Sequence, residues 1–227
     1  MKTIGIIGGM GPEATVLLMQ KLLVAAHATD DADHIPLIVH QNPAVPSRIR
    51  RLIDGSGVDP APVLAQMAQD LAAAGAQALA MPCNTAHAYA AQIAAATPLP
   101  FLDMRTATFD HLRGILPPGT RIGMLASPAV RMAQVFDAPF VASGLHPVYL
   151  PDDADLLALI RRVKAGDTGP DAQSEMTRIA RRLASHSDHL LIACTELSLL
   201  TSVISGMAWT DTLDCLTDSI VRFAKSA

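Results

Sequence analysis

The sequence predicts an α/β fold made of two similar lobes in tandem, each a mostly parallel sheet flanked by helices. Short apolar runs alternate with longer helical patterns along the 227 residues, and this alternation is typical of parallel sheets covered on both faces. The apolar run at 4–7 is echoed at 122–125, and the run before Cys83 is echoed before Cys194. The two offsets, 118 and 111 residues, are nearly equal and indicate an internal repeat. Chance likeness between buried strands is the alternative explanation.

The individual elements follow from the same alternation. The expected strands are residues 3–7, 35–40, 78–81, 121–125, 147–150 and 190–193. The expected helices are residues 13–26, 60–74, 86–95, 152–165, 171–184 and 213–224. Gly75 and Gly166 follow two of these helices, as is common at helix C-termini, and the Pro-Pro-Gly at 117–119 marks a turn.

Composition excludes several classes of protein. Half of the chain is hydrophobic and 17% is charged, which suits a sizeable core and argues against disorder. A net charge of −4 without a basic run argues against nucleic-acid binding. Three cysteines do not make a disulfide framework. The apolar N-terminal run is too short for a signal peptide, and no apolar run is long enough to span a membrane, so we expect a soluble cytoplasmic protein.

Two cysteines stand where the chemistry of an open α/β sheet is usually found. Cys83 and Cys194 each follow an apolar strand, and residues 84–85 and 195–196 are polar and suit helix N-caps. A thiol at a helix N-terminus feels the positive end of the helix dipole, which favours the thiolate. Paired placement favours function over the alternative of two buried structural cysteines. Cys215 lies inside the last helical pattern and is expected to fill core or surface space.

A glycine-rich turn follows the first strand at residues 8–15 (GGMGPEAT). It passes a loose form of the dinucleotide-binding pattern, for which Asp30, Asp31 or Asp33 would have to bind the ribose. A turn whose backbone amides hold a carboxylate is equally consistent, and so is a plain turn without a ligand.

Lysine is rare in this chain, and the rest of the sequence shows no metal-binding pattern. Arg48 follows the second strand and suits a carboxylate, although a solvated cluster with residues 50–51 is nearly as plausible. No phosphate-binding segment lies beside Lys164, as a pyridoxal phosphate enzyme would require. Its position alone therefore indicates a solvated cation at a helix C-terminus. The eight histidines show no metal-ligand spacing, so no metal is expected. His87 could tune the nearby thiol or cap the helix.

Three segments together resemble the signature segments of the aspartate/glutamate racemase family. They are residues 8–15, 81–87 (MPCNTAH) and 193–197 (ACTEL), and the resemblance covers nearly the whole chain. It implies two pseudo-symmetric lobes, residues 1–100 plus 208–227 and residues 101–207, with the active site in the cleft between them. It also implies racemisation of a small acidic amino acid without pyridoxal phosphate, metal or other cofactor. Members are often dimeric, so a homodimer is one expectation.

The resemblance carries over to particular residues. Cys83 and Cys194 would be the two acid/base thiols, one on each face of the substrate Cα. The expected substrate-binding residues are Met10, Arg48, Asn84, Thr85, Ser127, Lys164, Thr195 and Glu196. Among them, the amide and the two threonines would hold the α-carboxylate and the amine, and the two cations would hold the side-chain carboxylate. The chain departs from the family pattern at Ser47, Ile49, Ser127-Pro128 and Asp214-Cys215, which bears on the substrate more than on the reaction.

Other functions remain open at this stage. Aspartate is the first expected substrate and glutamate the second. The two differ by one methylene, which changes binding by only about 1–3 kcal/mol, so the sequence does not decide between them. A hydantoin racemase, or a maleate-type cis–trans isomerase with one cysteine as nucleophile, is the alternative. Residues 84–87 and Glu196 favour the racemase over these two. A non-catalytic nucleotide or amino-acid binding module ranks last.

Overall fold

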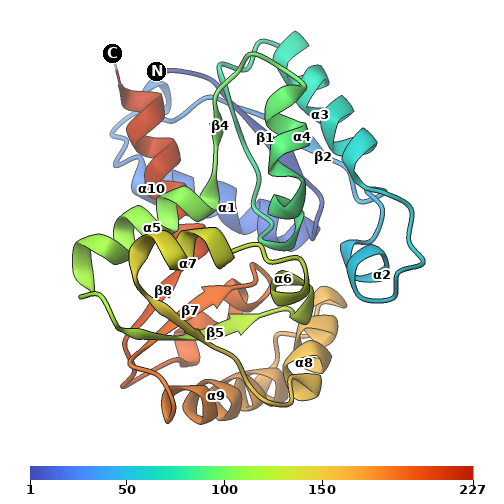
Figure 1. Ribbon diagram of the computed structural model, residues 1–227. Coiled ribbons are helices and arrows are strands. Elements are labelled where there is room, and N and C mark those ends of the chain that lie inside the picture. The colour runs from blue at the N-terminus through green and yellow to red at the C-terminus, as the bar shows by residue number, and fades with distance from the viewer. Residues whose placement is uncertain (227) are drawn as a thin grey trace.

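A computed structural model describes residues 1–226 and consists of two parallel four-stranded sheets, each flanked by helices (Figure 1). The first sheet has the order β2-β1-β3-β4 and the second the order β6-β5-β7-β8. Every neighbouring pair is parallel. In both sheets the strands, numbered from the first strand of that lobe, lie side by side in the order 2-1-3-4. The predicted α/β class and the internal repeat are therefore confirmed.

The strands of the first sheet are β1 (Ile4–Gly8), β2 (Leu37–Gln41), β3 (Ala78–Ala80) and β4 (Phe101–Leu102). Those of the second sheet are β5 (Arg121–Ala126), β6 (His146–Val148), β7 (His189–Ala193) and β8 (Trp209–Asp211). In the predicted repeat β1 corresponds to β5 and β3 to β7, and each pair occupies the same position in its sheet.

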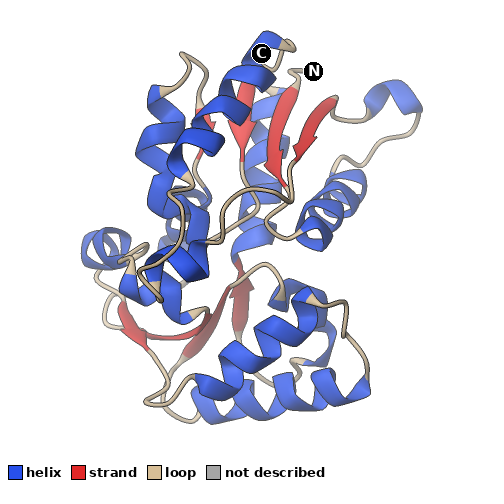
Figure 2. Ribbon diagram, turned by 90° about the vertical axis from the view of Figure 1, so that its right-hand side faces the viewer, coloured by secondary structure: helices blue, strands red, loops and turns tan. Residues whose placement is uncertain are grey.

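The helices lie between the strands and cover both faces of each sheet (Figure 2). The α-helices are α1 (Pro12–Ala25), α2 (Arg48–Leu52), α3 (Ala61–Ala73), α4 (Ala90–Ala95), α5 (Met104–Ile115), α6 (Pro128–Met132), α7 (Asp137–Ser143), α8 (Ala154–Lys164), α9 (Pro170–Ala184) and α10 (Thr212–Lys225). Three 3₁₀ turns complete the described elements, namely η1 (Asp31–Asp33), η2 (Thr85–Tyr89) and η3 (Leu197–Val203). Within residues 1–226, no helix is long and apolar enough to cross a bilayer.

Each sheet is buried on both faces, as its continuous apolar strands require. In β7 the side chains alternate, so that Leu190 and Ile192 pack under α8 and α9. Leu191 and Ala193 pack on the other face, with side chains of α5 and α7. In the first lobe, one face of the sheet packs on α3 and the other on α1 and α10.

The structure corrects several of the predicted elements. The short edge strands β4 and β8 were not predicted, and neither were the helices α2, α5, α6 and α7. The start of the helix expected at 86–95 is the 3₁₀ turn η2. Because β4 pairs with β3 and β8 pairs with β7, each sheet extends a few residues past the expected lobe boundaries at 100 and 207. Ala227, the last residue of the expected first lobe, lies outside the described residues.

Helix α10 carries the chain from the second lobe back to the first. It begins directly after β8, and its Leu213, Leu216 and Ile220 pack in the core of the first lobe. The backbone N–H of Lys2 donates to the carbonyl of Ala224 at 2.9 Å, so the two ends of the described chain lie together (Figure 1). This return connection places the end of β8 beside the boundary between the lobes.

Candidate active site

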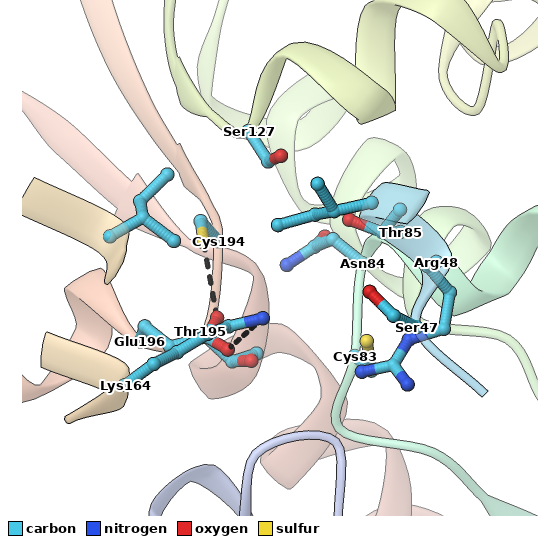
Figure 3. Close-up of a pocket in the computed structure, with 12 residues that line it drawn as sticks. Ser47, Arg48, Cys83, Asn84, Thr85, Ser127, Lys164, Cys194, Thr195 and Glu196 are labelled. Carbon is cyan, nitrogen blue, oxygen red and sulfur yellow. Dashed lines mark hydrogen bonds and ion pairs between the residues drawn. The ribbon is translucent and has the colours of Figure 1, made fainter. Parts of the chain in front are cut away.

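A pocket with an empty volume of about 400 Å³ lies between the lobes and is lined by residues of both. Figure 3 shows Cys194, Glu196 and Lys164 on one side and Cys83, Arg48 and Ser47 on the other. The lining residues are Ser47, Arg48, Ile49, Cys83, Asn84, Thr85, Ser127, Ile160, Lys164, Cys194, Thr195 and Glu196. The two halves of the repeat thus face each other across one small polar cavity.

The repeat positions the two cysteines at equivalent places. Cys194 directly follows β7, the third strand in the order of the second sheet, and Cys83 follows the equivalent strand β3 after a turn of two residues. The carboxyl ends of parallel strands are where open α/β sheets bind ligands. Both thiols are buried, with Cys83 7% and Cys194 5% exposed, and both are free of disulfide bonds.

Glu196 connects Cys194 to Lys164. The thiol of Cys194 donates to Glu196 Oε2 at 3.1 Å. Lys164 Nζ lies 3.2 Å from the other carboxylate oxygen, Oε1, as an ion pair. That oxygen is buried and receives no hydrogen bond of good geometry. Lys164 is therefore a pocket-lining cation with a carboxylate partner, and not the solvated cation that its sequence position alone indicates.

Burial and a neighbouring carboxylate favour the protonated thiol of Cys194. Burial raises the pKa of Cys194 well above its usual range, and the neighbouring Glu196 carboxylate raises it further, while the Lys164 ammonium opposes both. Burial lowers the pKa of Lys164, but the negative charge of the Glu196 carboxylate opposes this, and its pKa is raised. The expectation that a helix dipole favours the thiolate is thus wrong for Cys194. The segment after it is a 3₁₀ turn, and a carboxylate stands beside the sulfur.

On the other side of the pocket, His87 supports the loop that carries Cys83. Its Nδ1 lies 2.8 Å from the carbonyl oxygen of Cys83, and its Nε2 accepts from the backbone N–H of Met104 at 3.2 Å. These partners assign the proton to Nδ1, which donates to the carbonyl. Burial lowers the pKa of His87, although the nearby Asp103 opposes this, so the ring is neutral. His87 therefore contacts the backbone of Cys83 rather than its thiol.

Arg48 begins α2 and reaches the pocket from the first lobe. Its Nη1 donates to the carbonyls of Val45 and Pro46 at 3.2 and 3.0 Å, which fixes the guanidinium at the pocket wall. Its charge is close enough to lower the pKa of Lys164. Two cations held in one cavity make a site suited to a ligand with two carboxylates.

The two cysteine loops are also joined by side-chain hydrogen bonds across the lobe boundary. Asn84 Nδ2 donates to Thr212 Oγ1 at 3.0 Å, and Thr212 Oγ1 donates to the carbonyl of Ile192 at 3.0 Å. Thr195 Oγ1 donates to the carbonyl of Pro82 at 3.2 Å. Thr195 therefore binds the first lobe directly, and Asn84 is connected to β7 of the second lobe through Thr212, which fixes the spacing between the two loops.

Most of the predicted site residues come together in this pocket. Nine of the ten line it, and Met10 is the exception. Met10 is 3% exposed and packs in the first-lobe core with Ile7, Val45 and Cys83, so its thioether fills space behind the pocket wall. Ser127 lines the pocket and also caps α6, because its Oγ accepts from Ala129 N at 3.4 Å.

The departures from the family pattern lie in different places. Ser47 and Ile49 do line the pocket. Asp214 instead pairs with Lys21 at 2.5 Å, Cys215 is buried on α10, and neither lines the pocket. Sequence reasoning missed Ile160, which lines the pocket from α8. Its position four residues before Lys164 puts both on one face of the helix and would have identified it.

The glycine-rich turn forms a close backbone contact. Gly9 has a φ of +94°, and a Cβ there would lie 2.5 Å from the backbone of Asn42. Its N–H donates to Thr15 Oγ1 at 3.0 Å. Among residues 1–226, no group of three His, Cys, Asp or Glu side chains is arranged to hold a metal ion.

Comparison with known proteins places this geometry in a family. A model of the Asp/Glu/Hydantoin racemase family matches residues 7–219. The broad-specificity amino-acid racemase RacX of Bacillus subtilis is 25% identical over 224 residues, which are 96% of each chain. The aspartate racemase of Picrophilus torridus superposes with a TM-score of 0.88 at 25% identity, over 99% of this chain and 94% of that one. A glutamate racemase of Francisella tularensis in complex with D-glutamate has the same fold, with a TM-score of 0.65 at 14% identity, over 98% and 80% of the two chains. The family model spans both lobes and both cysteine loops, and the chain therefore belongs to the Asp/Glu/hydantoin racemase family of isomerases.

Proposed function

We propose that this protein racemises an acidic amino acid by proton transfer between Cys83 and Cys194, with aspartate as first substrate and glutamate as second, and without a cofactor. The observation that carries the proposal is the pair of buried thiols, one from each lobe, that line a single pocket. Racemisation removes the Cα proton on one face and returns a proton on the other, so it needs two acid/base groups on opposite sides of one carbon.

The proton balance assigns a starting state to each thiol. One sulfur begins as a thiolate and takes the Cα proton, while the other begins as a thiol and gives its proton to the opposite face of the carbanion. No proton is gained or lost, and the two sulfurs exchange states, so the reverse reaction starts from the exchanged pair. Burial and the Glu196 carboxylate raise the pKa of Cys194, which favours Cys194 as the sulfur that starts as the thiol.

The charges of the pocket support an acidic substrate. A carbanion next to a carboxylate spreads negative charge onto the carboxylate oxygens, and a fixed cation in a water-poor site stabilises that charge strongly. Lys164 and Arg48 provide two cations for the two carboxylates of aspartate or glutamate. Aspartate comes first because the relative from Picrophilus torridus is named an aspartate racemase and superposes over nearly the whole chain.

The direct test follows the Hα signal of L-aspartate and L-glutamate by proton NMR in D₂O with the reduced protein. We expect the signal to disappear and the D-enantiomer to form, with aspartate faster than glutamate. Cys83→Ser and Cys194→Ser each abolish racemisation, while the matched control Cys215→Ser, on α10 outside the pocket, retains it. Full racemisation by either pocket variant would contradict the two-thiol mechanism.

The family description also includes hydantoin racemases, which makes a hydantoin the second candidate substrate. A hydantoin ring lacks both free carboxylates, so it would offer no carboxylate to Arg48 and Lys164. We therefore expect slower exchange with a hydantoin than with aspartate in the same assay.

The expected homodimer is tested separately, by light scattering of the reduced protein.

A further inference from the structure

Two aliphatic side chains stand among the polar residues of the pocket, Ile49 on α2 and Ile160 on α8. Ile160 is 1% exposed and packs in the core of the second lobe, in the same cluster as Cys194. Ile49 is only partly buried, on a helix of five residues. Of the two, Ile160 is the more firmly held, and proton transfer between the thiols does not involve it.

The helix and the core together fix the side chain of Ile160. A β-branched side chain in a helix has one strongly preferred χ1 rotamer, so it does not swing aside when a ligand enters. Its neighbours on α8, Leu156, Leu159 and Val163, are each 1 or 2% exposed and pack in the same cluster. A close-packed interior has little free space into which a side chain can move. Ile160 therefore forms a rigid part of the pocket wall.

Ile160 also lies one helical turn before Lys164, on the same face of α8. The ammonium of Lys164 and the thiol of Cys194 contact the two oxygens of the Glu196 carboxylate, at 3.2 and 3.1 Å (Figure 3). The sulfur and the ammonium nitrogen therefore lie within about 9 Å of each other. Ile160 shares a core cluster with Cys194 and a helix face with Lys164, so it lines the pocket beside this span.

The shortness of this span bears on the length of the ligand. A Cα that exchanges its proton with the sulfur lies about 3–3.5 Å from it. A carboxylate oxygen bound by the ammonium lies about 2.7–2.9 Å from the nitrogen. With these contacts in line, about 3 Å remains between the Cα and that oxygen. The side chain of aspartate covers this distance, whereas the longer side chain of glutamate has to leave the line and needs room to one side.

We infer that Ile160 sets the length of acidic side chain that the pocket accepts, and that it favours aspartate over glutamate by occupying the space that the extra methylene needs. The inference rests on the proposed function, because it takes the substrate to be an acidic amino acid held by Lys164. Ile160 is a specificity residue and takes no part in proton transfer. Removal of one carbon from its side chain should make room for about one methylene.

The test measures the binding of succinate and glutarate by titration calorimetry under reducing conditions. These diacids have the carbon chains of aspartate and glutamate without the amine, so their binding is measured without turnover. Ile160→Val removes one carbon from the wall, and Ile160→Ala removes two more. The matched control is Ile179→Val, the same change at a fully buried position of α9, in the same core cluster but outside the pocket. Ile49→Val makes this change at the other aliphatic side chain of the pocket.

We expect the wild-type protein to bind succinate at least about tenfold more tightly than glutarate, the lower end of the effect of one methylene in a pocket. Ile160→Val should lower this preference by about tenfold through tighter binding of glutarate, and Ile160→Ala should lower it as far or further. Ile179→Val and Ile49→Val should keep the wild-type preference. In the racemase assay, the ratio of kcat/KM for glutamate to that for aspartate should rise by a similar factor in Ile160→Val.

Several results would overturn the inference. They are a wild-type protein that binds neither diacid or does not prefer succinate, Ile160 variants that keep the wild-type preference, and an Ile179→Val or Ile49→Val protein that loses it to the same extent. The proposed function fails separately. Absence of Hα exchange with either amino acid in the wild-type protein, together with a preference for succinate that Ile160→Val removes, would refute racemisation and support the assignment of Ile160.

Discussion

Replacing Glu196 by glutamine removes the negative charge beside the thiol of Cys194. Its oxygens lie 3.1 Å from Cys194 Sγ and 3.2 Å from Lys164 Nζ, and glutamine has nearly the same shape without the charge. Burial and the Glu196 carboxylate both raise the pKa of Cys194. The substitution leaves burial in place, so the pKa should fall but stay above its ordinary value.

The same substitution should lower the free energy of unfolding by about 1–3 kcal/mol. A hydrogen bond to a charged group contributes about 1.5–3 kcal/mol. The ion pair with Lys164 adds little, because a third of the Lys164 side chain is exposed and water screens the charge that remains. Loss of the buried carboxylate also relieves its desolvation, which offsets part of the effect. Urea unfolding gives this value.

The pKa is measured in a protein with Cys194 as the sole thiol. The chain has three cysteines, so Cys83→Ser and Cys215→Ser together leave only that one, and thiolate absorbance follows its titration. The control is Glu175→Gln, since Glu175 on α9 pairs with Arg178 outside the pocket. It should not move the titration. If Glu196→Gln left the titration in place or moved it to higher pH, burial alone would set the pKa of Cys194, and the reasoning would be refuted.

Three further perturbations have definite signs. Lys164→Gln removes the charge that lowers the pKa of Cys194, so the same titration should move to higher pH. Gly9→Ala forces a Cβ to within 2.5 Å of the Asn42 backbone at a φ of +94°, and should lower the free energy of unfolding by about 2–4 kcal/mol in urea. Burial raises the pKa of Asp211 to about 7. The folded state therefore holds this proton more tightly than the unfolded state. As the pH rises from about 4 to about 7, the free energy of unfolding of the wild-type protein should fall by up to about 4 kcal/mol. Asp211→Asn should remove that slope, as urea midpoints at several pH values would show.

Each of these outcomes has a matched comparison. Gly114 lies on an exposed turn of α5 where a Cβ meets nothing within 4 Å, so Gly114→Ala should be neutral or stabilise by up to about 1 kcal/mol. Equal losses in Gly9→Ala and Gly114→Ala would contradict the close backbone contact. A slope that persists in Asp211→Asn would mean that another group titrates, and a lower pKa in Lys164→Gln would reverse the assigned charge pattern.

The central strands could be predicted because they are buried on both faces and read as continuous apolar runs. This holds for β1, β3, β5 and β7, which lie inside their sheets. The edge strands β4 and β8 have two and three residues, too few to show a period, and only their pairing defines them. Helix α5 carries threonines and a glycine that weaken its pattern, although Asp103 at its N-cap accepts from Arg105 N and would have indicated its start.

Sequence alone could predict those pocket residues that directly follow a strand. Cys83, Asn84, Cys194 and Thr195 follow from that rule together with the repeat. Met10 also follows a strand, but its side chain packs inward, and no sequence pattern specifies which way a loop residue turns. The hydrogen bond between Asn84 and Thr212 joins residues 128 positions apart, and only the three-dimensional arrangement shows it.

The side chains near the two thiols differ at one position of the repeat. The residue two after Cys83 is Thr85, and the residue two after Cys194 is Glu196, so equivalent backbones carry a hydroxyl in one lobe and a carboxylate in the other. A hydroxyl adds no charge to its thiol, whereas the carboxylate accepts from Cys194 Sγ and raises its pKa. Lys164 pairs with that carboxylate and partly opposes its effect. Under the proposed mechanism the two lobes supply the two faces that racemisation needs, and burial together with the carboxylate of Glu196 favours the protonated state of Cys194 before substrate binds.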